Sequence, residues 1–109
     1  HCLFLTQPSA YRPNVEPLLR QKFWMTPIGT NFTLDLDSME HMLKLYNDHL
    51  VDFAKNNGLA YCDVQDVLPP TTQYFYDDIH YNAGGSFALA QAVLACVEKM
   101  YGTGFMKSN

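Results

Sequence analysis

The sequence of 109 residues contains no long apolar run and no cluster of basic residues. A membrane-spanning helix needs about 20 consecutive apolar residues, and no stretch of the chain approaches that length. Only seven Lys and Arg residues stand against 11 Asp and Glu residues, which gives a net charge of −4. Nucleic-acid-binding domains usually concentrate positive charge on one face. We therefore expect neither a membrane span nor a nucleic-acid partner.

Cysteines are few, and none of them is closely spaced. Cys2, Cys62 and Cys96 are an odd number, and no CxxC pair is present to indicate a zinc or redox motif. Cys2 and Cys62 fall in apolar, strand-like runs, and Cys96 falls in a helical segment. We expect all three to be buried free thiols that pack as small hydrophobic side chains.

The remaining composition is that of one folded domain. Hydrophobic residues make up 48% of the chain and charged residues only 17%, which argues against disorder. Apolar runs at residues 2–6 and 59–64 predict two buried strands. Residues 38–57 predict a helix that begins with Asp37 and Glu40 as a capping box and ends at Gly58. A final helix is predicted from Asn82 as N-cap to about residue 101, and a short helix at 18–24 within a long loop.

Both long helices have a predicted apolar face. The face of the first consists of Met39, Met42, Leu43, Tyr46, Leu50, Phe53 and Ala54. The face of the second consists of Phe87, Ala90, Val93, Leu94 and Val97. A helix between two apolar strands indicates a right-handed parallel crossover, and therefore an α/β sheet. Two parallel strands covered on both faces need neighbouring strands. We therefore expect residues 1–109 to be the C-terminal part of one larger domain, with the other strands upstream.

The chemistry of the chain is concentrated around Asp77 and His80. Both follow the second predicted strand, and ligands of open α/β sheets bind at the carboxyl ends of the strands. A carboxylate three residues before a histidine can accept the proton of its Nδ1, which leaves Nε2 free to act as a base. Asn82 and Gly85 then open the last helix.

These residues resemble the last motif of the SGNH (GDSL-type) hydrolases, an Asp-x-x-His followed by a glycine and an Ala-rich helix. The match consists of Asp77, His80, Asn82 and Gly85, with Ala88, Ala90, Ala92 and Ala95 in the helix. The stretches Leu3-Phe4-Leu5-Thr6-Gln7-Pro8 and Tyr61-Cys62-Asp63-Val64 also look like the family.

The resemblance implies a fold, an activity and roles for two residues. The fold would be the C-terminal half of a three-layer α/β/α, flavodoxin-like domain with a parallel sheet. The activity would be hydrolysis of an ester, such as an acetylated carbohydrate or a lipid, without metal or organic cofactor. Asp77 would be the orienting acid and His80 the general base. The family's nucleophilic serine and its oxyanion-hole glycine and asparagine have no match here. The serine is expected upstream, and these residues alone should be inactive.

Several alternatives remain open from the sequence. Asp78 could accept from His80 in place of Asp77, or Asp77, Asp78 and His80 could bind a metal, as in a metal-dependent phosphoesterase. The chain could also be a non-catalytic binding domain that keeps the fold. Other residues have simpler interpretations as surface, capping, turn or core positions: His41, His49, Asp63, Ser9, Ser38, Ser86, Trp24, Phe75 and Tyr81.

Overall fold

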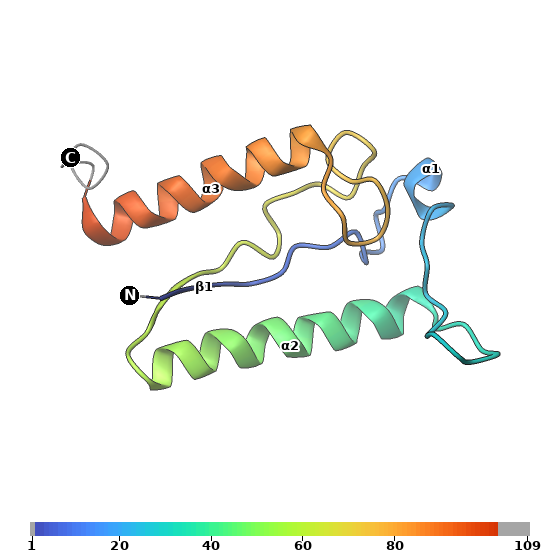
Figure 1. Cartoon of the computed structure of the whole chain (residues 1–109), viewed down its shortest axis with the longest axis horizontal. Helices are drawn as coiled ribbons and strands as arrows, with labels where there is room; N and C mark the ends of the chain where they lie inside the picture. The colour runs from blue at the N-terminus through green and yellow to red at the C-terminus, as the bar shows by residue number, and fades with distance from the viewer. Residues whose placement is uncertain (1, 103–109) are drawn as a thin grey trace.

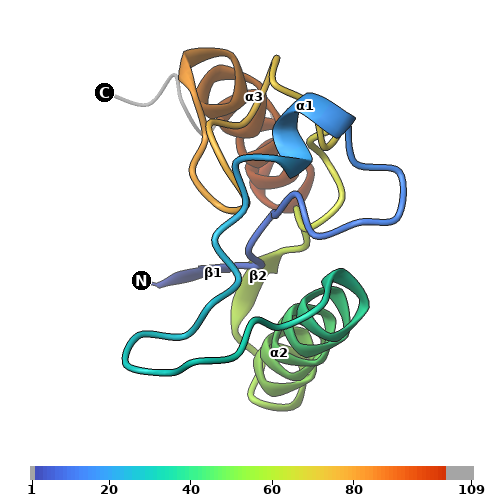
Figure 2. The same cartoon turned by 90° about the vertical axis from the view of Figure 1, so that its right-hand side faces the viewer.

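The computed structural model describes residues 2–102 as a small mixed α/β structure with three helices and a two-stranded parallel sheet. The elements follow in the order β1 (Leu3–Leu5), α1 (Pro17–Arg20), α2 (Leu36–Asn56), β2 (Ala60–Cys62) and α3 (Ala83–Tyr101). The two long helices lie on opposite sides of the strand pair (Figure 1; Figure 2). The predicted α/β class and the parallel crossover are confirmed.

The two strands pair in parallel, with Leu3 opposite Ala60 and Leu5 opposite Cys62. Both are shorter than the predicted runs of 2–6 and 59–64. The backbone N–H of Thr6 continues the pairing to the C=O of Cys62 at 3.2 Å. The expected burial of β1 on both faces is not observed, since Leu5 is 42% exposed. Within residues 2–102, no strand pairs with the other edge of β1.

Helix α2 begins two residues earlier than the sequence predicts. Its N-cap is Asp35, whose carboxylate accepts a hydrogen bond from the backbone N–H of Ser38 at 2.7 Å. The predicted capping box of Asp37 and Glu40 is therefore wrong, and Asp37 lies in the first turn instead. The predicted end is confirmed: Gly58 follows the helix with φ +63°, in the left-handed region that glycine tolerates best.

The predicted apolar face of α2 is only partly buried. Tyr46 is 62% exposed, whereas Asn47 and Ala54 are the buried residues of the helix. A two-stranded sheet is narrow, so it covers only a narrow strip of the helix. Asn47 lies on this strip because its amide bonds to the backbone of Gln7, accepting from the N–H at 2.8 Å and donating to the C=O at 2.9 Å.

The N-cap of α3 is confirmed as Asn82, but its predicted inner face is wrong in part. Phe87 points outward and is 67% exposed. The other predicted residues line an open apolar groove of about 530 Å³ between α3 and the end of β1. Its lining consists of Leu5, Tyr81, Ser86, Leu89, Ala90, Val93, Leu94 and Val97. The side of β1 toward α3 is therefore only loosely filled by the described residues.

The expectation of three buried free thiols is wrong. Cys62 and Cys96 form a disulfide that joins the end of β2 to α3, and Cys2 is a free, exposed thiol. The two partners are 34 residues apart and belong to elements of different type. Spacing along the chain therefore contains no sign of their pairing.

The main apolar core lies under the loops at one end of the strands. It consists of Ala10, Leu19, Leu68 and Phe75, with partly buried Val15, Phe23, Tyr74, Tyr81, Ala88 and Leu89 around it. Helix α1 contributes Leu19, and its start is favoured by Pro17 in the first turn. The loops that follow β1 and β2 are thus held on a common core. No helix in residues 2–102 combines the length and the apolar character needed to cross a membrane.

Opening the link between β2 and α3 should destabilise the fold. Reduction of the Cys62–Cys96 disulfide is expected to lower the free energy of unfolding by about 2–4 kcal/mol, because the cross-link restricts the unfolded chain. Urea unfolding of the complete protein with and without dithiothreitol measures this loss. A double variant, Cys62→Ala with Cys96→Ala, should not respond to the reductant, and Cys2→Ala should respond as the native sequence does. An equal response of the native and double-variant proteins would contradict the pairing.

Candidate active site

Asp77 and His80 lie at the tip of a short hairpin, residues 75–81. An antiparallel bridge between Phe75 and Tyr81 closes its base, and the backbone N–H of Tyr76 donates to the C=O of His80 at 2.8 Å. Phe75 is buried in the loop core and anchors the base, whereas Tyr76, Ile79 and His80 are exposed. Figure 1 shows this segment beyond the C-terminal end of β1, beside the start of α3. The hairpin thus presents Asp77 and His80 where the sequence predicts them.

The side chains of Asp77 and His80 are in direct contact. Nδ1 of His80 lies 2.9 Å from Oδ2 and 3.1 Å from Oδ1 of Asp77. The same Oδ1 accepts the backbone N–H of His80 at 2.8 Å and that of Ile79 at 3.0 Å. These backbone bonds form an Asx-type turn, which orients the carboxylate toward the ring. The side chain of His80 is 71% exposed, so the ring edge that carries Nε2 is accessible.

Asp77 is held in its charged form. Partial burial opposes ionisation, but hydrogen bonds from the backbone N–H groups of His80 and Ile79 and from the His80 ring outweigh it and lower the pKa of Asp77. Next to a carboxylate, a neutral imidazole places its proton on Nδ1, where it can be donated. Nε2 then carries the free lone pair. This is the tautomer that a general base requires.

Asp78 points the other way, although it is the neighbour of Asp77. Its side chain is 5% exposed and accepts a hydrogen bond from the hydroxyl of Tyr11, on the loop after β1. The backbone C=O of Asp78 accepts the N–H of Ala10 at 2.8 Å. The alternative in which Asp78 orients His80 does not correspond to the observed contacts.

Asn82 and Gly85 join the hairpin to α3. The side-chain oxygen of Asn82 accepts the backbone N–H of Gly85 at 3.0 Å, and its amide donates to the C=O of Thr72 at 2.8 Å. The first turn of the helix lies directly against the preceding loop. A Cβ on Gly85 would lie 2.1 Å from the backbone oxygen of Tyr74. The glycine five residues after His80 is therefore required by this close approach.

The other candidate residues named from the sequence occupy capping, surface or core positions. Asp63 accepts from the hydroxyl of Thr6 at 3.0 Å and from Gln65, as expected of a loop-capping residue. His41 and His49 are exposed on α2. Of the three candidate pocket aromatics, Trp24 is exposed, Phe75 belongs to the core, and Tyr81 packs edge-on against Phe75. In the part of the chain that the structure describes, no three His, Cys, Asp or Glu residues are grouped to hold a metal.

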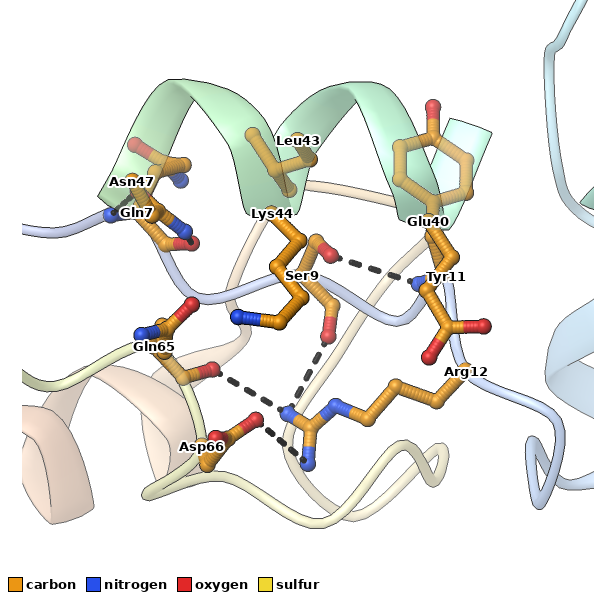
Figure 3. A pocket seen from close by; sticks show the side chains of 10 residues that line it. All are labelled: Gln7, Ser9, Tyr11, Arg12, Glu40, Leu43, Lys44, Asn47, Gln65 and Asp66. Atoms are coloured by element: carbon orange, nitrogen blue, oxygen red, sulfur yellow. Dashed lines mark hydrogen bonds and ion pairs between the residues drawn. The ribbon is translucent and has the colours of Figure 1, made fainter. Parts of the chain in front are cut away.

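Arg12 is an unexpected member of the region. Its guanidinium donates to the C=O groups of Leu68 at 2.6 Å, Ser9 at 3.2 Å and Gln65 at 3.4 Å. It thereby ties the loop after β1 to the loop after β2, beside a polar cavity of about 260 Å³ that adjoins α2 (Figure 3). A lone arginine in a loop belongs to no motif, so nothing in the sequence marks this role.

Among the described residues, no hydroxyl or thiol group is hydrogen-bonded to the Asp77–His80 pair. Within residues 2–102, the ring of His80 hydrogen-bonds to Asp77 alone. Ser9 is a turn residue whose hydroxyl accepts from the backbone N–H of Tyr11 at 3.4 Å, and Ser38 lies in the first turn of α2. Comparison of the chain with protein-family models, curated proteins and solved structures found no match.

A side chain at position 85 should disturb both the hairpin and the start of α3. We expect Gly85→Ala to lower the free energy of unfolding by about 1–3 kcal/mol or more, because the new methyl group collides with the backbone of Tyr74. Urea unfolding of the complete protein measures the loss. Ser86→Ala is the matched control, since the side chain of Ser86 is exposed in the same helical turn. Equal stability of the two variants would show that the close approach is absent.

Proposed function

We propose that this chain carries the acid and the base of a serine ester hydrolase of the SGNH type. The observation that supports this most directly is the contact of 2.9 Å between the Asp77 carboxylate and Nδ1 of an exposed His80. The backbone bonds that orient Asp77 add to the support, because they arrange the acid independently of any substrate.

In this proposal Asp77 and His80 act through a serine in another part of the complete protein. Nε2 of His80 removes the proton of the serine hydroxyl as its oxygen attacks the carbonyl carbon of the ester. The imidazolium is stabilised by Asp77 and returns the proton to the leaving alcohol. Water, activated by the same nitrogen, then cleaves the acyl-serine and releases the acid. The reaction needs no metal or organic cofactor, and acetylated carbohydrates and lipid esters are the substrate classes to assay.

The proposal also includes a larger fold, the three-layer flavodoxin-like domain of that family. Two features of the described residues favour additional parallel strands beside β1. One edge of β1 has no strand partner among them, and Leu5 lines the open apolar groove along α3. A strand on this edge would bury that apolar surface and stabilise the fold by about 25 cal/mol for each Å² removed from water.

Disrupting either member of the pair should strongly reduce turnover in the complete protein. We expect Asp77→Asn and His80→Ala each to reduce kcat for p-nitrophenyl acetate by up to roughly 10⁴-fold, because a misoriented or absent base cannot activate the serine. Circular dichroism and urea unfolding check that the fold is intact. Full activity of His80→Ala would refute the proposed function. Inactivity of native protein against every ester class would favour a binding domain instead.

Residues 1–109 expressed alone should hydrolyse no ester and should unfold without a sharp transition. The first expectation follows because a base without a nucleophile has nothing to activate. The second follows because marginal domains have only about 5–15 kcal/mol of stability to lose and the groove beside α3 is open. Thermal unfolding and a p-nitrophenyl acetate assay test both. A cooperative transition would contradict the second expectation, and turnover that depends on His80 would contradict the first.

A further inference from the structure

Asp78 is a buried carboxylate without a cationic partner. It is 5% exposed, and within residues 2–102 no Lys, Arg or His forms an ion pair with it. A buried carboxylate is costly unless hydrogen bonds compensate for the lost water. The hydroxyl of Tyr11 is the side-chain donor that it has. This hydrogen bond thus anchors the residue that directly follows Asp77.

Tyr11 is itself held firmly from three directions. Its side chain is buried, its ring packs edge-on against Phe23 with 5.5 Å between centroids, and its backbone N–H bonds to Ser9. The preceding residue, Ala10, donates its N–H to the backbone C=O of Asp78 at 2.8 Å. The loop after β1 therefore holds Asp78 through hydrogen bonds to both its backbone and its side chain. Tyr11 and Asp78 are 67 residues apart in the sequence.

The hydrogen bonds that hold Asp78 also affect Asp77, because these adjacent residues of the hairpin point to opposite sides. Asp78 points inward to Tyr11, and Asp77 points outward to His80. If the inward anchor were released, Asp78 could turn out toward the solvent and the histidine. Two carboxylates would then compete for the same ring nitrogen. The orientation of the first acid is thus tied to the anchoring of the second.

We propose that Tyr11 and Asp78 are positioning residues: their buried hydrogen bond holds the 75–81 hairpin so that Asp77 alone meets Nδ1 of His80. This inference rests on the proposed function for its catalytic consequence, but the positioning itself is a statement about His80 that can be observed without any substrate.

The pKa of Tyr11 is consistent with a hydroxyl that always donates its hydrogen bond to Asp78. Burial, followed by the hydrogen bond to Asp78 and the charges of Asp78 and Asp77, raises the pKa of Tyr11 well above its usual value. The hydroxyl therefore keeps its proton at neutral pH. Tyr11→Phe removes only this hydroxyl and leaves the ring that packs on Phe23.

The test combines kinetics with NMR of His80 in the full-length protein. We expect Tyr11→Phe to reduce kcat for p-nitrophenyl acetate roughly 10–100-fold, since misplacement by about 1 Å can cost that much, while KM changes by less than about twofold. The Nδ1 proton resonance of His80, shifted downfield by its carboxylate partner, should weaken or move upfield. In a double-mutant cycle, Tyr11→Phe and Asp78→Asn should be non-additive, because both act through one contact.

A matched control separates positioning from general stability. Thr6→Val removes another buried hydroxyl, which bonds to Asp63 at 3.0 Å and accepts from the N–H of Val64 at 2.7 Å. It should destabilise the protein to a similar extent and leave kcat and the His80 resonance unchanged. An unchanged resonance and kcat in Tyr11→Phe would overturn the inference. Retained activity in His80→Ala would instead refute the proposed function, and the resonance would still test the positioning.

Discussion

The parallel pairing of β1 with β2 is the constraint on which the rest of the structure depends. Parallel strands end at the same edge of a sheet, so the loops that follow Leu5 and Cys62 emerge side by side. This is why residues from the first dozen positions can meet residues near position 80. The contacts between Tyr11 and Asp78, and between Arg12 and Leu68, join these two neighbouring loops.

Polar side chains stabilise these loops where a sheet or helix would use its own backbone. The amide of Asn47 pairs with both backbone groups of Gln7, just beyond the end of β1. The guanidinium of Arg12 binds three carbonyl groups of two loops. Buried backbone groups almost always need such partners. Long irregular segments can therefore hold a fixed geometry without regular secondary structure, provided that each buried carbonyl and N–H is satisfied.

The sequence predicts those parts of the structure that depend on local pattern. Apolar periodicity locates α2 and α3, Asn82 marks the start of α3, and the three-residue step from Asp77 to His80 predicts their contact. What fails is what depends on distant partners. Phe87 is exposed because the described residues cover only a small part of α3. The hydrogen bond from Tyr11 to Asp78 joins residues 67 positions apart. Neither has a signature along the chain.

The disulfide between Cys62 and Cys96 also determines what happens when the backbone is cut. The 75–81 hairpin and the loop before it lie between the two cysteines, within the 34-residue interval that the bond spans. A protease that cleaves there produces two pieces that stay covalently joined, with the second long helix still attached to the end of β2. Such a nicked molecule would migrate as one species until it is reduced. Cleavage in this segment thus does not release a fragment unless the disulfide is also reduced.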